Sequence, residues 1–167
     1  MTIRTAVPAD FDRIMEIYRS AQDFMIASGN PDQWGHFHPS PELIQSDIES
    51  GISRVVCDGD VIHGVFVMLF GPDPTYGVIE DGAWLNDSQY VVIHRIASDG
   101  TGGVFRAVIS CGKSLCDNIR IDTHADNLVM QRHIEESGFV RCGIIHLANG
   151  SPRIAYQWTR ERGARGL

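Results

Sequence analysis

Hydrophobic residues return every three or four positions in the segment that follows Pro8, which is the spacing of an amphipathic helix. Asp10 is placed to cap the start of this helix, and Gly29 is placed to end it. A short strand at Thr2–Thr5 precedes the helix, and a second helix is expected over Pro41–Ser50. The apolar face of the first helix consists of Phe11, Ile14, Met15, Ile17, Tyr18, Ala21 and Met25.

The pattern changes to β-rich runs after the second predicted helix. Residues 53–70 read SRVVCDGDVIHGVFVMLF, and the Asp58-Gly59 pair inside them is a strong hairpin signal. A second pair of runs, VRCGIIHL and RIAYQWT, lies on either side of Asn149-Gly150 near the end of the chain. The segments QYVVIHRIAS (89–98) and NIRIDTH (118–124) predict single strands.

Two further helices are expected between these strands. The segment VFRAVISCGKSLC predicts a short helix, and its apolar side consists of Val104, Ala107, Val108, Cys111 and Leu115. The segment ADNLVMQRHIEESGF predicts a helix that Asp126 or Asn127 caps and Gly138 ends. The order β-α-α-β-β-β-α-β-α-β-β predicts an α+β fold in a single domain over residues 1–160, with a frayed tail at 161–167.

Composition narrows the function classes. The chain has 167 residues, of which 43% are hydrophobic, and its net charge of −7 argues against a nucleic-acid partner. The N-terminus lacks a signal-peptide pattern and no apolar run is long enough to cross a bilayer, so we expect a cytoplasmic protein without a membrane partner. The four cysteines lack zinc-ligand spacing and are expected to be buried and reduced: Cys57, Cys111, Cys116 and Cys142.

The stretch DGTGGVFRAVISCGKS (99–114) can be interpreted as three different phosphate loops. A Walker A loop would use Gly112-Lys113-Ser114, but the residues before it are apolar and follow a helical pattern, which leaves Lys113 and Ser114 at exposed positions late in a helix. A Rossmann loop would need a third glycine where Phe105 stands.

The third interpretation is a strand, a tight glycine turn and the start of a helix. Backbone N–H groups at Gly102, Gly103, Val104 and Phe105, with the helix dipole behind them, would hold a pyrophosphate. The alternative is a plain strand–helix turn in which the glycines supply positive φ. The loop alone does not decide between these two readings.

Four segments around this loop share a pattern and an order with one known family. They are IRTAVPADFDRIMEIYRSA, VIHRIAS, NIRIDTHADNLVMQRHIEESGF and CGII…GSPRIAYQW. With them the chain resembles the GCN5-related N-acetyltransferase (GNAT) superfamily over nearly its whole length, most specifically from Asn127 to Gly138-Phe139. The resemblance implies a mixed, mostly antiparallel sheet of about seven strands with about four helices, splayed between the fourth and fifth strands.

The resemblance also implies an acetyl-CoA site. Pyrophosphate would lie on the N–H groups of Gly102, Gly103, Val104 and Phe105, and the pantetheine amides would bond to the backbone of Ile96, Ala97 and Ser98. Asn127 would contact the pantetheine arm, with a helix N-cap as its alternative role. The family motif has Arg or Gln where this chain has Gly100, and Gly or Ala where it has Phe105.

Transfer of an acetyl group to an amine requires a base, donors for the oxyanion and a proton for the leaving thiolate. The family often supplies that proton from a Tyr at the place where this chain has Ile134. The candidate bases are His94 and Glu80, and Glu80 can also attract a cationic amine. Their alternatives are a packed structural histidine and a solvated loop acid. A metal site from Asp122, His124 and His94 is disfavoured, so no metal is expected.

The loop NPDQWGHFHP occupies the place where the family varies its acceptor contacts. Trp34, His36, Phe37 and His38 either line an acceptor wall or, in the case of Trp34, fill the core under the loop. The leading function is transfer of an acetyl group from acetyl-CoA to a primary amine of a small molecule or peptide. The alternative is a non-catalytic acyl-CoA-binding or regulatory module, and a homodimer is left open.

Overall fold

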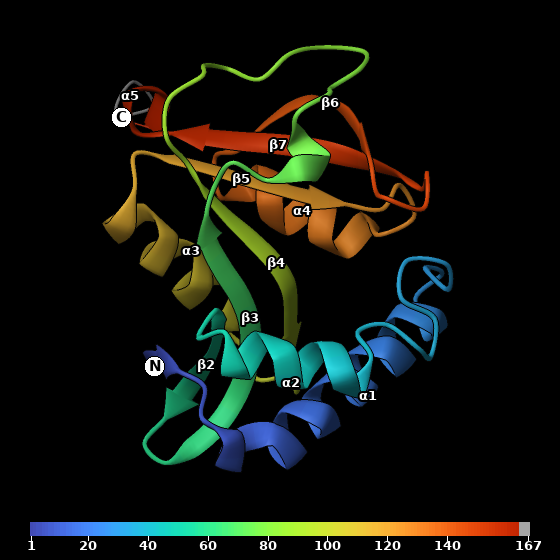
Figure 1. The fold of residues 1–167 in the computed structure, drawn as a ribbon, viewed down its shortest axis with the longest axis vertical. Coiled ribbons are helices and arrows are strands. Elements are labelled where there is room, and N and C mark those ends of the chain that lie inside the picture. Colours follow the sequence, from blue (N-terminus) through green and yellow to red (C-terminus); the bar gives the residue numbers. More distant parts are fainter. Residues whose placement is uncertain (164–167) are drawn as a thin grey trace. The chain divides into compact units, whose positions relative to one another are not determined.

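The computed structural model describes residues 1–163 of the chain (Figure 1). Seven strands form one sheet in the order β1-β2-β3-β4-β5-β7-β6. Pairing is antiparallel between β1 and β2, β2 and β3, β5 and β7, and β6 and β7, whereas β4 and β5 pair in parallel. This mixed, mostly antiparallel sheet confirms the predicted fold class.

The elements follow the predicted order and lie close to the predicted ranges. The strands are β1 Thr2–Thr5, β2 Ser53–Asp58, β3 Val61–Phe70, β4 Val91–Ser98, β5 Asn118–Thr123, β6 Val140–His146 and β7 Pro152–Thr159. The helices are α1 Phe11–Ala27, α2 Pro41–Glu49, α3 Val104–Leu115, α4 Leu128–Glu136 and the short α5 Arg160–Gly163, with 3-10 turns η1 at Pro8–Asp10 and η2 at Pro74–Tyr76.

Contacts within the chain define two compact units. The first unit comprises Met1–Met68 and His94–Cys111, and the second comprises Leu69–Ile93 and the residues from Gly112 on. Parallel pairing of β4 with β5 is formed at Val91 with Ile119 and at Val92 with Arg120, and both strands continue beyond these pairs. Each of β3, β4 and α3 is divided between the two units.

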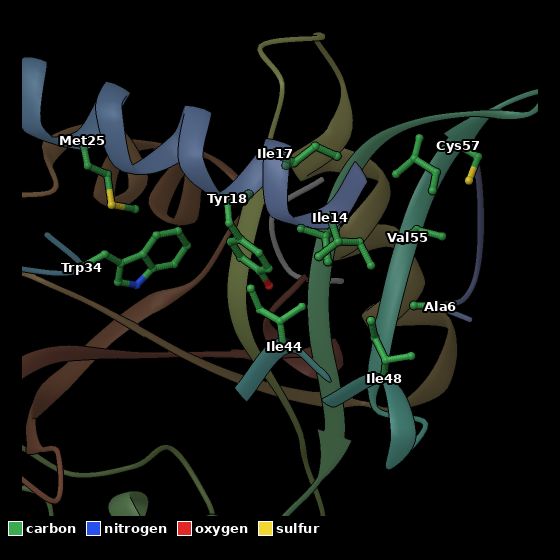
Figure 2. Close-up of a cluster of buried hydrophobic side chains, with 13 residues drawn as sticks. Ala6, Ile14, Ile17, Tyr18, Met25, Trp34, Ile44, Ile48, Val55 and Cys57 are labelled. Carbon is green, nitrogen blue, oxygen red and sulfur yellow. The ribbon is translucent and has the colours of Figure 1, made fainter. Parts of the chain in front are cut away.

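The first unit is built around the apolar faces of α1 and α2, which pack on β2 and β3 (Figure 2). Its core confirms the helical face predicted for α1, because Ile14, Ile17 and Tyr18 are almost completely buried. Trp34 also belongs to this cluster, and its ring lies edge-on to the ring of Tyr18 with centroids 5.8 Å apart. Trp34 therefore fills the core under its loop, while Phe37 is 86% exposed.

The second unit has its own cluster of aromatic and apolar side chains, which includes Tyr76, Tyr90 and Val92. The buried guanidinium of Arg120 lies 4.1 Å from the ring centre of Trp84 and 3.9 Å from that of Tyr90. Burial lowers the pKa of Arg120, although the charge of a guanidinium persists in proteins. The two aromatic faces compensate part of the lost hydration of this cation.

The helix boundaries confirm three of the predicted signals. Gly29 and Gly138 follow the ends of α1 and α4 with φ of +90° and +88°, which an L-residue with a Cβ rarely adopts. Asn127, and not Asp126, caps α4, because its Oδ1 accepts a 3.0 Å hydrogen bond from the N–H of Met130. Asp10 precedes α1 but its side chain does not cap that helix. Its carboxylate instead binds the guanidinium of Arg4.

The end of α3 differs from the prediction. Leu115 was expected on the buried side but is 49% exposed. Lys113 was expected at the surface, yet its Nζ donates to the Ser137 carbonyl at 3.0 Å and lies 4.7 Å from the ring centre of Trp158. The contact of Lys113 is made with the end of α4, which lies far along the chain, so the local spacing of apolar residues could not predict it. Because Ala107–Ser114 are helical, the Walker A interpretation is excluded.

The cysteines and the tail complete the comparison with the sequence. None of the four cysteines, all within residues 1–163, forms a disulfide bond; Cys57 and Cys142 are buried as expected, whereas Cys111 and Cys116 are half-buried. Of the predicted tail, residues 161–163 belong to α5, and residues 164–167 lie outside the described part of the chain.

The absence of a side chain at Gly64 on β3 sets the position of α3. A Cβ at this position would clash with Val104 Cγ1 and would lie 3.2 Å from the carbonyl oxygen of Ala97. We expect Gly64→Ala to lower the free energy of unfolding by about 1–3 kcal/mol, the usual cost of overpacking. Gly77→Ala is the control, because its Cβ would meet only the Pro74 carbonyl oxygen at 3.6 Å. Equal stability of both variants in urea unfolding would contradict this account.

Candidate functional site

The predicted glycine loop lies between β4 and α3, in the first unit. Two hydrogen bonds between residues close in sequence fix its conformation. The N–H of Gly100 donates to Ser98 Oγ at 3.1 Å, and the N–H of Thr101 donates to Asp99 Oδ1 at 3.0 Å. Gly100 and Gly103 have φ of +94° and +91°. These two glycines are therefore required by the backbone, as the alternative interpretation of the loop proposed.

The same loop presents an open stretch of backbone at the start of a helix. A Cβ at Gly100 or Gly102 would meet no atom within 4 Å, and one at Gly103 would meet only the end of the Met1 side chain at 3.9 Å. The helix α3 begins directly afterwards, at Val104, and is 12 residues long. The first N–H groups of a helix have no partner inside it and lie at the positive end of its dipole, so this segment is suited to an anion.

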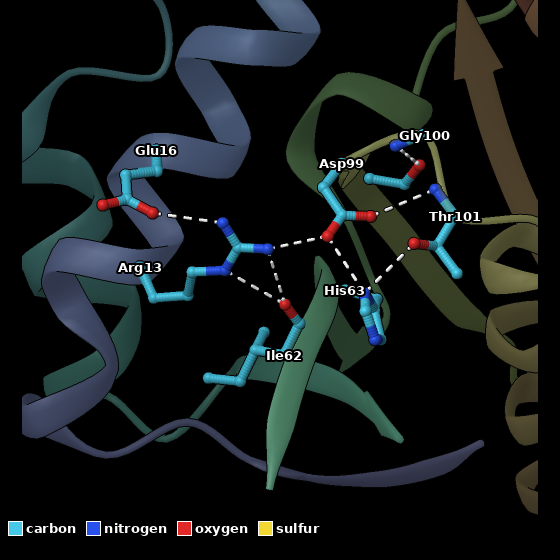
Figure 3. Close-up of polar contacts among 8 residues, drawn as sticks. Arg13, Glu16, Ile62, His63, Asp99, Gly100 and Thr101 are labelled. Atoms are coloured by element: carbon cyan, nitrogen blue, oxygen red, sulfur yellow. Dashed lines mark hydrogen bonds and ion pairs between the residues drawn. The ribbon is translucent and has the colours of Figure 1, made fainter. Parts of the chain in front are cut away.

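A polar cluster that the sequence did not indicate surrounds the first residues of this loop (Figure 3). The Asp99 carboxylate accepts a 2.7 Å hydrogen bond from Arg13 Nη2 of α1 and lies 3.0 Å from His63 Nδ1 of β3. The Thr101 hydroxyl lies 3.1 Å from the same His63 nitrogen. Arg13 and His63 lie 86 and 36 positions away from Asp99, which is why no local motif could reveal the cluster.

The strand β4 contains a strained residue. Arg95 has a φ of +52°, an uncommon value for a non-glycine residue. The Tyr18 hydroxyl of α1 donates to the Arg95 carbonyl at 3.0 Å, and the Asp47 carboxylate of α2 accepts two hydrogen bonds from the Arg95 guanidinium, at 2.9 and 3.0 Å. Backbone strain of this kind persists only where the surroundings hold it, and it concentrates at functional sites.

The electrostatics around Asp47 reflect its depth in the first unit. Burial raises the pKa of Asp47, and the charges of Arg95 and His94 act in the opposite direction without fully compensating for burial. Burial also raises the pKa of Tyr18 beyond its ordinary value, so its hydroxyl remains a donor. His94 is half-buried on β4, next to the strained residue and within electrostatic range of Asp47.

Glu80 lies in the second unit, on a segment that forms an antiparallel bridge with β6. The N–H and the carbonyl of Glu80 bond to the carbonyl and the N–H of Ile144, each at 2.8 Å. The two segments lie this close because Gly82 and Gly143 lack side chains, and a Cβ at either would clash with backbone oxygens. The Glu80 carboxylate is 61% exposed and lies 3.9 Å from His146 Nδ1.

Asn127 and Ile134 lie on or next to α4, also in the second unit. Asn127 is buried and its Oδ1 serves as the helix cap, as the alternative role predicted. Ile134, which stands where the family often has a tyrosine, is completely buried. A buried aliphatic side chain cannot provide a proton.

Metal-ligand groups and membrane-spanning helices were both sought among residues 1–163. In this range no group of three or more His, Cys, Asp or Glu side chains is suited to hold a metal ion. Asp122, weighed above as a ligand, accepts a 2.7 Å hydrogen bond from the Tyr76 hydroxyl. None of the helices in the same range combines the length and apolar character needed to span a bilayer.

Solved structures with the same fold give this geometry a context. A GNAT-family acetyltransferase from Streptococcus agalactiae matches with a TM-score of 0.85 and 28% identity, covering 95% of this chain and 94% of its own. The chain has the GNAT fold. The resemblance read from the sequence is thereby confirmed, although no protein-family model matches the sequence and no curated protein matches it significantly.

More distant GNAT structures contain ligands. Aminoglycoside acetyltransferase AAC(6')-Ib in complex with coenzyme A and kanamycin matches with a TM-score of 0.63 and 17% identity, covering 99% of this chain and 98% of its own. Another structure of AAC(6')-Ib contains acetyl-CoA and matches with a TM-score of 0.65 and 18% identity, over 99% of this chain and 96% of its own. At this identity the two structures establish the shared fold.

The predicted site residues divide between the two units. The first unit holds most of them on β4, in the glycine loop and at the start of α3: His94, Ile96, Ala97, Ser98, Gly102, Gly103, Val104 and Phe105. The second unit holds Glu80 and Asn127. Sequence reasoning missed Arg95 and Asp47, because an arginine inside a strand carries no local signal of positive φ.

The contact between the buried Asp47 and the half-buried Arg95 can be tested by its effect on stability. Asp47→Asn keeps the size of the side chain but removes one of the two acceptor oxygens, so one hydrogen bond of the Arg95 guanidinium is lost. We expect a loss of about 1–3 kcal/mol in the free energy of unfolding, measured in urea, the usual cost of such a bond. Glu49→Gln on the exposed side of α2 is the control. A loss below about 0.5 kcal/mol, typical of surface changes, would contradict the proposed constraint on β4.

Proposed function

We propose that the chain is an N-acetyltransferase that moves the acetyl group of acetyl-CoA directly to a primary amine of a small molecule or peptide. The observation that carries this proposal is the open glycine turn at the start of α3, preceded by the strained residue of β4. Solved structures of the same fold that contain coenzyme A or acetyl-CoA support the assignment. The kanamycin bound to AAC(6')-Ib supports a small-molecule amine as acceptor.

The first unit provides donors for an anion without a basic side chain in the loop. Gly100 stands where the family has Arg or Gln, so the backbone N–H groups from Gly102 to Phe105 would carry the pyrophosphate. Because Gly100 and Gly102 have open space where a side chain would stand, a ligand can approach the backbone closely. The groups present therefore fit a pyrophosphate.

The remaining contacts of the cosubstrate would come from β4 and α4. The backbone of Ile96, Ala97 and Ser98 would bond to the pantetheine amides in the manner of an added strand. Asn127, in the second unit, remains the family-implied candidate for a contact with the cosubstrate, in addition to its role as the cap of α4.

In the reaction, the acceptor ammonium first loses a proton to His94, and the neutral nitrogen attacks the thioester carbonyl. The C–N bond forms first and gives a tetrahedral oxyanion, which backbone N–H groups beside Arg95 would stabilise. The C–S bond breaks when this intermediate collapses, and the nitrogen gives its second proton to water. Glu80 would attract a cationic amine. Because Ile134 cannot provide a proton, the thiolate leaves as an anion and takes a proton from water.

Ile134 also favours a second candidate function. Without the usual tyrosine, the chain can serve as a non-catalytic acyl-CoA-binding module with the same loop. Incubation with acetyl-CoA and a panel of amines, with free thiol as the readout, separates the two functions. Binding without release of thiol favours the module.

A charge in the loop tests the pyrophosphate site. Gly102 has no positive φ and no close neighbour, so a side chain here causes no strain. We expect Gly102→Asp to raise the Kd for CoA about tenfold or more, because the added carboxylate repels the pyrophosphate, whereas the isosteric Gly102→Asn changes it much less. Isothermal titration calorimetry gives both values. Equal Kd values for the Asp and Asn variants would argue against a pyrophosphate at this loop.

The general base is tested by substitution of His94. His94→Gln keeps a similar size and should lower kcat by about a hundredfold or more while leaving CoA binding intact. His133→Gln on the exposed side of α4 is the control. Normal turnover by the His94 variant would exclude it as the base.

Glu80 makes a separate contribution in this mechanism. Its exposed carboxylate attracts cationic amines, so Glu80→Gln should raise KM for a cationic acceptor with a smaller effect on kcat. A neutral acceptor analogue should show no such change. If Glu80→Gln instead lowers kcat as strongly as His94→Gln is expected to, Glu80 is the base.

A further inference from the structure

The polar cluster in Figure 3 suggests how this chain prepares its unusual glycine loop for a ligand. We propose that Asp99 is a positioning residue, held by Arg13 and His63, that keeps the loop in its anion-binding conformation before the cosubstrate arrives; this inference rests on the proposed function. Asp99 touches the loop backbone on one side and fixed elements of the first unit on the other. It therefore links the loop to the scaffold.

The carboxylate of Asp99 uses its two oxygens for two different tasks. Oδ1 accepts the N–H of Thr101, which closes a turn at the start of the loop. Oδ2 accepts from Arg13 Nη2 at 2.7 Å and lies 3.0 Å from His63 Nδ1. Because a charged carboxylate only accepts hydrogen bonds, the proton between His63 and Asp99 belongs to Nδ1. Burial acts to raise the pKa of Asp99, but the bonds from Thr101 and His63 outweigh it and keep its pKa below the ordinary value.

The partners of Asp99 are themselves anchored. Arg13 lies on α1 and also donates from Nε and Nη2 to the carbonyl of Ile62, at 3.1 and 3.0 Å. His63 follows Ile62 on β3, and its carbonyl accepts the N–H of Asp99 at 3.0 Å. Side chain and backbone of Asp99 are thus tied to β3 at neighbouring positions, and α1 closes the cluster from the other side.

The contacts of Asp99 reduce the conformational freedom of the glycine-rich loop before a ligand binds. Glycine loses more conformational freedom on ordering than any other residue, and three of the four residues from Gly100 to Gly103 are glycines. If the ligand had to order them, part of its binding free energy would be lost. A preformed turn removes this cost, which matters more here because no basic side chain of the loop assists binding.

The experiment compares three proteins: wild type, Asp99→Asn and Glu16→Gln. The Asn side chain is isosteric with Asp but keeps only one acceptor oxygen, so either the bond from Thr101 or the bonds from Arg13 and His63 are lost. Glu16 is the matched control, because it is 61% exposed and binds Arg13 at 3.1 Å on the side away from Asp99. Hydrogen–deuterium exchange of the ligand-free proteins and calorimetric titration with CoA are the two measurements.

We expect Asp99→Asn to speed amide exchange at residues 100–105 and to raise the Kd for CoA about tenfold, the scale of one lost charge-assisted hydrogen bond. Exchange in β2 and β3 should stay close to that of the wild type. The Glu16→Gln variant should match the wild type in both measurements. If Asp99→Asn does not fold, Arg13→Gln removes the same anchor from the α1 side and should show the same local change.

Other outcomes overturn the inference in distinguishable ways. Unchanged loop exchange in a variant that binds CoA like the wild type would show that Asp99 does not position the loop. Faster exchange throughout the first unit would show a merely structural role. A wild-type protein that does not bind CoA would overturn the proposed function itself, whereas wild-type binding together with an unaffected Asp99→Asn variant would overturn only this inference.

Discussion

An ion pair between the buried Asp47 and the half-buried Arg95 holds β4 in a conformation that an isolated strand would not adopt. The positive φ of Arg95 is unfavourable by itself, and the hydroxyl of Tyr18 on its carbonyl and the carboxylate of Asp47 on its guanidinium keep it in place. Much of the candidate site depends on this strand. It carries His94 and the backbone from Ile96 to Ser98, and it leads directly into the glycine loop.

Two points of this region, the middle of β4 and the start of the glycine loop, are each held by a carboxylate paired with an arginine. Asp47 fixes the middle of β4 from α2, and Asp99 fixes the start of the loop through α1 and β3. A buried or half-buried carboxylate is costly unless a cation accompanies it, and in each case an arginine does. Such a pair contributes defined geometry to the site, because charge-assisted hydrogen bonds have preferred directions that apolar packing lacks. Side chains of this kind keep a site within the narrow tolerance that binding requires.

Glycines also shape the structure, because the absence of a side chain lets backbone segments approach one another closely. Gly64 allows the first residue of α3 to pack on β3, and in the second unit Gly82 and Gly143 let the segment of Glu80 pair with β6. In the loop, Gly102 and its neighbours leave the backbone accessible from outside. Ligand binding by N–H groups needs such access, and it needs no conserved side chain. The departure of the loop from the family motif at Gly100 and Phe105 is therefore compatible with an anion site.

The sequence by itself determined the order of the elements, the apolar face of α1 and the turns at Gly59 and Gly150, because each depends on residues within a few positions of one another. For the cap of α4 it offered Asp126 or Asn127, and the structure selects Asn127. It also indicated the GNAT fold through the combined order of its segments. Only the tertiary structure decided what depends on distant partners. Arg95 meets Asp47 across 48 positions, and Arg13 meets Asp99 across 86, so no local pattern could indicate either pair. Lys113 is the reverse case: periodicity placed it at the surface, and the carbonyl of Ser137 and the ring of Trp158 drew it into a contact.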